Sequence, residues 1–469
     1  MLFKKIISFI FALIVSLSGL FSQSLQTVPV TAEGAIFGGA DNDAIQMELK
    51  FDTKWITANT NKIYNSALAS FSVVLCDDIY YRAKDLAKGT QNRVLVNGAE
   101  DAYAQTALLE KLGYTDVKYI ESFKQKSYAA DSNDSVTMLM AYKNVDNKYD
   151  SFIFVLRGCF SAGERLSTFD IGSDTDAYTA LTGAHTEWTN KAVCKGLDVA
   201  ANRAMEFIDE YIAAHDVPEC RNTALTTGHS RGASLANIIG AKLEDDESVK
   251  SYTYTFNTMP FTTDKEAVNY KTIFNLFDEN DFYSNPIPFG REQMYRYGQD
   301  ITLNIAGSDK VKEEIAALKG RSDYTCLAPE TKAEYDKLFG EAFPDRASLY
   351  QTKTLTVNFA TAEEMNAAAE ALRKNASDLG IAAFVQVETD ETENTVTLTY
   401  CGAALLYCLA QIQCYGEAAY DVVVSLFRGD DAYCRLAEIM QNGLAGAAGG
   451  HLLINSYILA KHMKYLGCK

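Results

Sequence analysis

Hydrophobic residues recur along the first three hundred positions in two periods, one typical of strands and one typical of helices. Residues 152–156 form a continuous apolar run, as expected of a strand that is buried on both faces of a sheet. Further strands are predicted at 136–144, 223–227, 251–256 and 272–277, and helices at 64–84, 102–112, 192–215 and 233–243. Strands and helices that alternate in this order predict an α/β fold with a mostly parallel sheet covered by helices on both faces.

The pattern changes after residue 291. Helices are predicted at 311–318, 330–343 and 362–377, strands at 354–359, 383–389 and 395–400, and further helices over 402–442 and 452–466. The last two strands are joined by a turn at 390–394, which predicts a hairpin. We interpret residues 292–440 as an inserted, cap-like α+β region, and residues 33–291 and 441–469 as the two parts of an α/β core.

The first residues have the pattern of a targeting segment. Lysines at positions 4 and 5 precede a mostly apolar run at 6–21, and small residues at 30–32 occupy the positions that a signal peptidase reads. We therefore predict a signal peptide over 1–32 with cleavage after Ala32. The apolar run is short for a span of roughly 20 residues, which favours secretion or a cell-surface location over a membrane anchor.

The composition narrows the classes of function. The chain of 469 residues carries a net charge of −18, which excludes a nucleic-acid binder as a first hypothesis because phosphate contacts need clustered Lys and Arg. The ten cysteines include no C-x-x-C pair, so neither a zinc ribbon nor a redox motif is indicated, and spacing alone does not give their pairing. These features favour a protein that works on neutral or amphiphilic substrates.

Residues 227–232 read Thr-Gly-His-Ser-Arg-Gly and lie between the predicted strand at 223–227 and the predicted helix at 233–243. A serine at the apex of a strand–turn–helix unit is a nucleophile elbow, which projects a weakly nucleophilic hydroxyl toward a general base. Gly228 and Gly232 remove the Cβ atoms that would clash where the strand and the helix pack closely. The sequence therefore predicts that Ser230 is a catalytic nucleophile.

A serine nucleophile needs a base and a carboxylate that orients the base, and in this unit the chain order is serine, acid, histidine. Asp278 and Asp281 both follow the predicted strand at 272–277. Asp281 precedes the apolar, proline-bearing segment 282–289, which can fold over the carboxylate and shield it from water. We favour Asp281 as the acid and keep Asp278 as the alternative.

Two histidines lie downstream of the acid. His451 follows Gly449 and Gly450, which allow a sharp turn, so that a base on this loop can reach across to the serine. His462 lies inside the last predicted helix, where a surface or core role is the simpler interpretation. We favour His451 over His462 as the base.

The negative oxygen that develops during acyl transfer needs two backbone N–H donors. One is expected from Arg231, the residue after the nucleophile. The other is expected from the loop after the strand at 152–156, which points to the backbone N–H of Cys159. The sequence therefore predicts an oxyanion hole formed by Cys159 and Arg231.

Four segments resemble the class 3 lipases, a branch of triacylglycerol lipase-like esterases. They are the strand end at 154–159, the elbow at 227–232, the strand end at 255–260 and the acid segment from 275 to 288, in that order. The resemblance implies an α/β-hydrolase-like, mostly parallel sheet flanked by helices, and the pattern after residue 291 adds an α+β insert between the acid and the histidine. The chain departs from the family pattern at Cys159, which replaces a hydroxyl residue, at Arg231, which replaces Leu, and in the wide separation of Asp281 and His451.

These observations predict an exported serine carboxylic-ester hydrolase, lipase-like or esterase-like, that acts through an acyl-enzyme on Ser230. The expected partner is an acyl ester or lipid substrate, with transient contact to a lipid interface and no nucleic acid. No metal or organic cofactor is expected, and the sequence does not give the oligomeric state. Two alternatives stay open: a serine peptidase or acyltransferase on the same scaffold, and a non-catalytic surface or binding protein with a relict hydrolase fold.

Overall fold

The computed structural model describes residues 26–32, 45–52, 54–57, 61–79, 104–121, 136–158, 192–278, 281, 284, 294–303, 309, 313, 329–345, 347–348, 351–379, 381–415 and 417–445. Most of the predicted helix at 311–318 and all of the one at 452–466 lie outside these residues. None of the helices within these ranges combines the length and the apolar character that crossing a membrane requires.

The main sheet of the described part of the chain has seven strands, which follow one another in sequence order from β3 to β9. The strands are β3 (Thr115–Glu121), β4 (Thr137–Val145), β5 (Tyr149–Leu156), β6 (Arg221–His229), β7 (Val249–Phe256), β8 (Ile273–Asp278) and β9 (Gln299–Leu303). The pairs β3–β4 and β4–β5 are antiparallel, and every pair from β5 to β9 is parallel. The mostly parallel sheet that the sequence predicted is thus confirmed.

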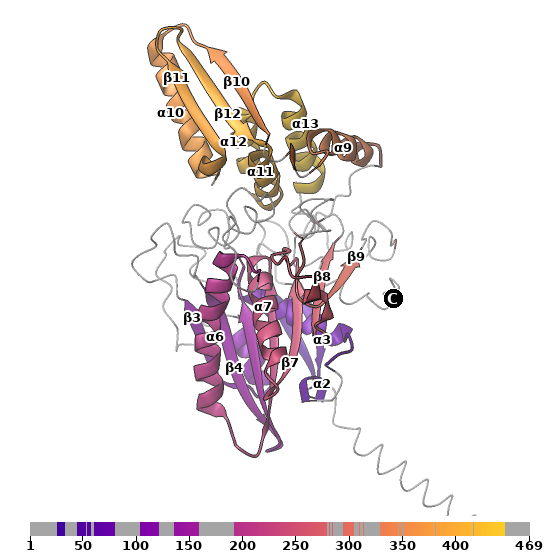
Figure 1. Ribbon diagram of the computed structural model, residues 1–469. Helices are drawn as coiled ribbons and strands as arrows, with labels where there is room; N and C mark the ends of the chain where they lie inside the picture. The colour runs from indigo at the N-terminus through magenta and orange to yellow at the C-terminus, as the bar shows by residue number, and fades with distance from the viewer. Residues whose placement is uncertain are drawn as a thin grey trace, which may run out of the picture.

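Helices cover both faces of this sheet (Figure 1). On one face lie α6 (Lys195–His215) and α7 (Arg231–Asp245), and on the other lie α2 (Lys54–Thr57), α3 (Ser66–Asp78) and α4 (Ala104–Lys111). Strand β5 shows why its run is apolar throughout, since Phe152 and Phe154 pack with α6 and α7 whereas Ile153 and Val155 pack with α3 and α4. This two-sided burial fixes the sheet between its helix layers.

A two-stranded antiparallel sheet of β1 (Gln26–Ala32) and β2 (Ile45–Phe51) precedes the core, and Ala32 pairs with Ile45. Strand β1 falls inside the predicted signal peptide at 1–32. Cleavage after Ala32 would therefore remove the partner strand of β2. The location of the protein and the cleavage of this segment remain predictions.

The α+β insert is built around a second sheet of three strands in the order β10–β12–β11. Its elements are α9 (Pro329–Ala342), β10 (Thr352–Asn358), α10 (Ala362–Asp378), the 3-10 turn η7 (Ala382–Phe384), β11 (Val385–Asp390), β12 (Thr395–Cys401), α11 (Gly402–Tyr415), α12 (Glu417–Leu426), α13 (Asp431–Ile439) and the π-helical turn η8 (Met440–Ala445). Met365 and Ala369 of α10 pack on Val396 of β12. The carboxyl ends of β5 to β8 lie at one end of the main sheet, and Figure 1 shows the insert next to that end.

Two strands of the main sheet were absent from the sequence prediction. Strand β9 pairs with β8 although residues 292–440 were assigned to the insert, so the core sheet extends at least to Leu303. Strand β3 lies at the opposite edge and was likewise not predicted. Both lie at the edges of the sheet that the described residues form, and their short polar sequences lack the continuous apolar run of a central strand.

Candidate active site

Ser230 occupies a sharp turn between β6 and α7, as the sequence predicted. Its backbone has φ 56° and ψ −128°, a conformation that residues with a Cβ atom rarely adopt. Ser230 N donates a hydrogen bond to Phe256 O at 3.0 Å, and Ser230 O accepts from Ala233 N at 2.9 Å and Ser234 N at 3.2 Å. The neighbouring strand β7 and the first turn of α7 therefore hold this strained serine in one conformation.

The two glycines of the elbow are required by close backbone contacts. A Cβ atom on Gly228 would lie 2.2 Å from Gly232 O, and a Cβ atom on Gly232 would lie 2.3 Å from Leu156 O. Both distances are far inside van der Waals contact, and both neighbours are backbone atoms that cannot move aside. The ends of β5 and β6 therefore pack directly against the N-terminus of α7.

This packing brings the end of β5 to the start of the helix that follows the nucleophile. Arg231 is the first residue of α7, so the positive end of the helix dipole lies at the elbow. The carbonyls of Leu156 and Arg157 lie against Gly232. Cys159, the other predicted donor of the oxyanion hole, lies outside the described residues. The strand end that precedes Cys159 is nevertheless next to the elbow.

The side chains of the elbow are buried, and the sequence analysis did not anticipate this for the arginine. His229 and Ser230 are each 6% exposed and Arg231 is 1% exposed. Arg157, at the end of β5, is 3% exposed. Arg157 and Arg231 are therefore both buried, and they belong to the two segments that meet at the elbow. At position 231 the class 3 lipase pattern has Leu.

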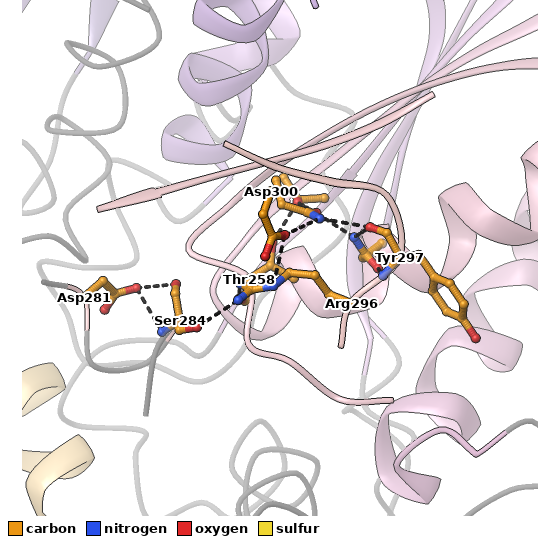
Figure 2. A network of polar contacts seen from close by, with 9 residues as sticks. Thr258, Asp281, Ser284, Arg296, Tyr297 and Asp300 are labelled. Carbon is orange, nitrogen blue, oxygen red and sulfur yellow. Dashed lines mark hydrogen bonds and ion pairs between the residues drawn. The ribbon is translucent and has the colours of Figure 1, made fainter. Parts of the chain in front are cut away.

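Asp281 is completely buried, as the sequence predicted for the favoured acid. Its Oδ2 atom accepts three hydrogen bonds: from Asn257 Nδ2 at 2.9 Å, from Ser284 N at 3.2 Å and from Ser284 Oγ at 2.5 Å. Figure 2 shows Ser284 turned toward the carboxylate. Donors that converge on one oxygen fix the orientation of the carboxyl group.

Asn257 connects the end of β7 to this carboxylate. It follows the last residue of β7 and has φ 57°, in the left-handed region that Asn tolerates better than most residues. Asn257 N donates to Leu276 O of β8 at 2.9 Å, which anchors the backbone while Nδ2 reaches Asp281. Asp278, the alternative acid, is the last residue of β8 and pairs with Leu303 of β9.

His451 and His462, the two candidate bases, lie outside the described residues. Two other histidines are described. His229 ends β6 directly before the nucleophile. His215 ends α6, where Nδ1 contacts Tyr211 O at 2.9 Å and Nε2 contacts Asp116 Oδ2 at 2.9 Å, which indicates a structural role. The base therefore remains a prediction.

A network of buried polar side chains lies near Asp281 (Figure 2). Asn237 of α7 donates to Asn275 Oδ1 of β8 at 2.6 Å and to Tyr297 O at 2.8 Å. Thr255 Oγ1 of β7 donates to the same Asn275 Oδ1 at 2.7 Å and accepts from Thr258 Oγ1 at 2.7 Å. The network thus connects α7, the helix after Ser230, to β7, to β8 and to the segment that precedes β9.

The sequence analysis assigned no role to Asn257, Ser284 or Arg296. Some signals for this network were present, since Asn237 and Asn275 are amides inside an otherwise apolar helix and strand. Ser284 also stands three residues after Asp281, a spacing at which local side-chain-to-backbone hydrogen bonds form. No periodic pattern marks Arg296, which lies in an irregular segment.

Within the described ranges, no three His, Cys, Asp or Glu residues are grouped so that they could hold a metal ion. The six cysteines whose side chains the structure describes are free thiols: Cys76, Cys194, Cys220, Cys401, Cys408 and Cys434. Burial raises the pKa of the Cys408 thiol well above its ordinary value, so this thiol stays protonated and behaves as a small apolar group.

No protein-family model matches the sequence, and no curated protein matches it. Among solved structures, the chain is similar to the triacylglyceride lipase of Rhizomucor miehei, with 14% identity and a TM-score of 0.30 over 51% of this chain and 80% of that one. It is similar to the mono- and diacylglycerol lipase of Aspergillus oryzae, with 15% identity and a TM-score of 0.32 over 50% and 77%. It is also similar to a triacylglycerol lipase whose catalytic centre is a serine protease triad, with 14% identity and a TM-score of 0.31 over 51% and 81%. Each of these three solved structures is of a lipase.

Proposed function

We propose that this protein is a serine carboxylic-ester hydrolase, lipase-like or esterase-like, with Ser230 as its nucleophile. The observation that carries the proposal is the strained backbone of Ser230 between β6 and α7, with Gly228 and Gly232 in backbone contact beneath it. A strained non-glycine conformation persists only where the surrounding structure enforces it, and such strain clusters at functional sites.

In the proposed reaction, Ser230 Oγ attacks the ester carbonyl while His451 takes the hydroxyl proton as general base. The backbone N–H groups of Arg231 and Cys159 hold the negative oxygen of the tetrahedral intermediate. His451 then gives the proton to the leaving alcohol, which forms the acyl-enzyme. Water activated by His451 attacks the acyl-enzyme and releases the carboxylic acid and Ser230.

Asp281 is proposed to orient the imidazole and to stabilise its positive charge. Its burial supports this role, because a carboxylate shielded from water interacts more strongly with a nearby cation. The hydrogen bonds from Asn257 and Ser284 support it too, since they restrict the rotation of the carboxyl group.

We further propose that the α+β insert caps the site and that the protein is exported and meets its substrate at a lipid interface. In an α/β sheet the ligand site lies at the carboxyl ends of the strands. Figure 1 shows the insert next to this end of the main sheet. Buried residues of the core and of the insert also belong to one hydrophobic cluster.

The nucleophile is tested with Ser230→Ala, measured by hydrolysis of a short-chain nitrophenyl ester and by labelling with a fluorophosphonate probe. We expect the variant to fold, to lose hydrolysis and to remain unlabelled. Ser234→Ala is the matched control, because it truncates a buried serine one turn further along α7, and it should keep both activities. Hydrolysis by a folded Ser230→Ala protein at the wild-type rate would exclude the proposal.

The cap is tested by replacing Thr352–Cys401 with a short turn. Thr352 and Cys401 are partners across β10 and β12, so the ends of this unit are neighbours and a short linker can join them. We expect the folded deletion to change the preference for acyl chain length and to keep some activity on small esters. An unchanged substrate profile would show that this unit is remote from the site.

A further inference from the structure

Arg296 is a buried cation that connects three segments around the acid. It is 5% exposed, and its Nη2 donates to Ser284 O at 2.9 Å while its Nη1 donates to Thr258 O. Its Nε contacts Asp300 Oδ1 at 3.3 Å, and its guanidinium lies over the ring of Phe277 at 4.2 Å from the centroid. Figure 2 shows Arg296 between the Ser284 segment and Asp300.

The two carbonyls that Arg296 binds belong to the two segments that hold Asp281. Ser284 supplies two of the three donors on Asp281 Oδ2, and Thr258 is the neighbour of Asn257, which supplies the third. A guanidinium is a planar fork of fixed shape, so it can set the separation of two acceptors in a way that one flexible ammonium cannot. The position of Asp281 therefore depends on Arg296 through the two segments that supply the donors to its carboxylate.

We propose that Arg296 is a positioning residue for the acid: it clamps the segments of Asn257 and Ser284 together and thereby holds Asp281 in place. The inference rests on the proposed function, because it assigns Arg296 a part in the same ester hydrolysis. Arg296 touches neither the substrate nor the reacting atoms in this scheme. Its loss should lower kcat and leave the binding of substrate, and hence KM, nearly unchanged.

The test is a double-mutant cycle with Arg296→Gln and Asp281→Asn, measured as kcat and KM on a short-chain ester. We expect Arg296→Gln alone to lower kcat by about 30-fold with KM within about twofold. In the Asp281→Asn background the same change should lower kcat by less than about threefold, because the acid that Arg296 positions is already lost. Equal losses in the two backgrounds, or wild-type kcat in a folded Arg296→Gln protein, would overturn the inference.

Two further variants keep the test decisive if Arg296→Gln does not fold. Arg296→Lys keeps the charge and one donor but not the planar fork, so it should fold and have a kcat below that of the wild type. Asp300→Asn is the control, since it keeps an oxygen acceptor for Arg296 Nε on the side away from the acid, and it should hold kcat within about threefold. An Arg296→Lys protein with wild-type kcat would also overturn the clamp.

The failure of this inference and the failure of the proposed function give different results. Full activity of Ser230→Ala would reject the hydrolase mechanism itself, whatever Arg296 does. An inactive Ser230→Ala protein combined with additive losses at Arg296 and Asp281 would keep the hydrolase and reject only the clamp.

Discussion

Ser230 and Asp281 are held by two consecutive residues at the end of β7. Phe256 O accepts the hydrogen bond of Ser230 N at 3.0 Å, and Asn257 Nδ2 donates to Asp281 Oδ2 at 2.9 Å. The same short backbone segment therefore positions both the proposed nucleophile and the proposed acid. A displacement of this strand end would therefore move both groups.

The first prediction concerns the amide of Asn257. Asn257→Gly removes the donor to Asp281 and suits the left-handed backbone, so the fold should persist while kcat falls about tenfold, as expected for one lost hydrogen bond to a carboxylate. The control is Asn394→Gly, since Asn394 has a similar φ of 51° in the hairpin of the insert. Steady-state kinetics should show a loss for Asn257→Gly only, and equal kcat values for the two variants would contradict the role of Asn257.

The second prediction concerns the glycines of the elbow. Gly228→Ala and Gly232→Ala each place a methyl group against backbone atoms, so each should lower the free energy of unfolding by about 3 kcal/mol or prevent folding. Gly340→Ala in α9 meets no atom within 4 Å and should raise it by about 0.5–1 kcal/mol. Urea unfolding of the three variants measures the difference, and a Gly232→Ala protein as stable as the wild type would argue against the backbone contact with β5.

The third prediction distinguishes the two candidate acids. Asp281→Asn keeps the shape of the side chain but removes the charge that stabilises an imidazolium, so kcat should fall by a factor on the order of 10⁴. Asp278→Asn should have a small effect. The ratio of the two kcat values on the same ester is the measurement, and a larger loss for Asp278→Asn would transfer the role to Asp278.

The fourth prediction distinguishes the two candidate bases. His451→Ala should lose kcat by a factor on the order of 10⁶, as removal of a catalytic histidine does, while the folded protein keeps its far-ultraviolet circular dichroism. His462→Ala should keep most of the activity. If the inactive variant is instead His462→Ala, the base has been assigned to the wrong residue.

The fifth prediction concerns the stability of the insert at low pH. Partial burial by itself raises the pKa of the Asp430 carboxyl, but donors at Lys353 Nζ, Tyr433 N and Tyr400 Oη outweigh it and hold the pKa below its usual value. Because the pKa is lowered in the folded state, the stabilisation is present above the unfolded value of about 3.9 and is lost as the pH falls through the folded value.

Asp430→Asn should therefore destabilise the protein at pH 7, and its difference from the wild type should shrink as the pH falls below about 4. Urea unfolding of both proteins at pH 7 and at pH 3 measures the difference in their free energies of unfolding. A difference that stays constant from pH 7 to pH 3 would mean that the charge of Asp430 contributes nothing. Asp430 also caps the N-terminus of α13, directly after Gly429, which has φ 107°.

Local sequence determined much of the fold. The apolar run at 152–156 predicted a strand buried on both faces, and the elbow sequence predicted the strand, the turn and the helix around Ser230. The apolar segment after Asp281 correctly indicated a buried carboxylate. These features follow from periodicity, glycine geometry and hydrophobic burial, which act over a few neighbouring residues.

Only the tertiary structure decided what surrounds the acid and where the core sheet ends. Asn257 and Arg296 lie near Asp281 because β7, β8 and β9 are neighbours in the sheet. No local sequence pattern predicts such a contact. Strand β9 has its place in the core because its backbone pairs with β8, although its short polar sequence has no core-strand pattern. Pairing between distant segments depends on the whole topology, which is why the sequence predicted a buried carboxylate at Asp281 but not the residues that hold it.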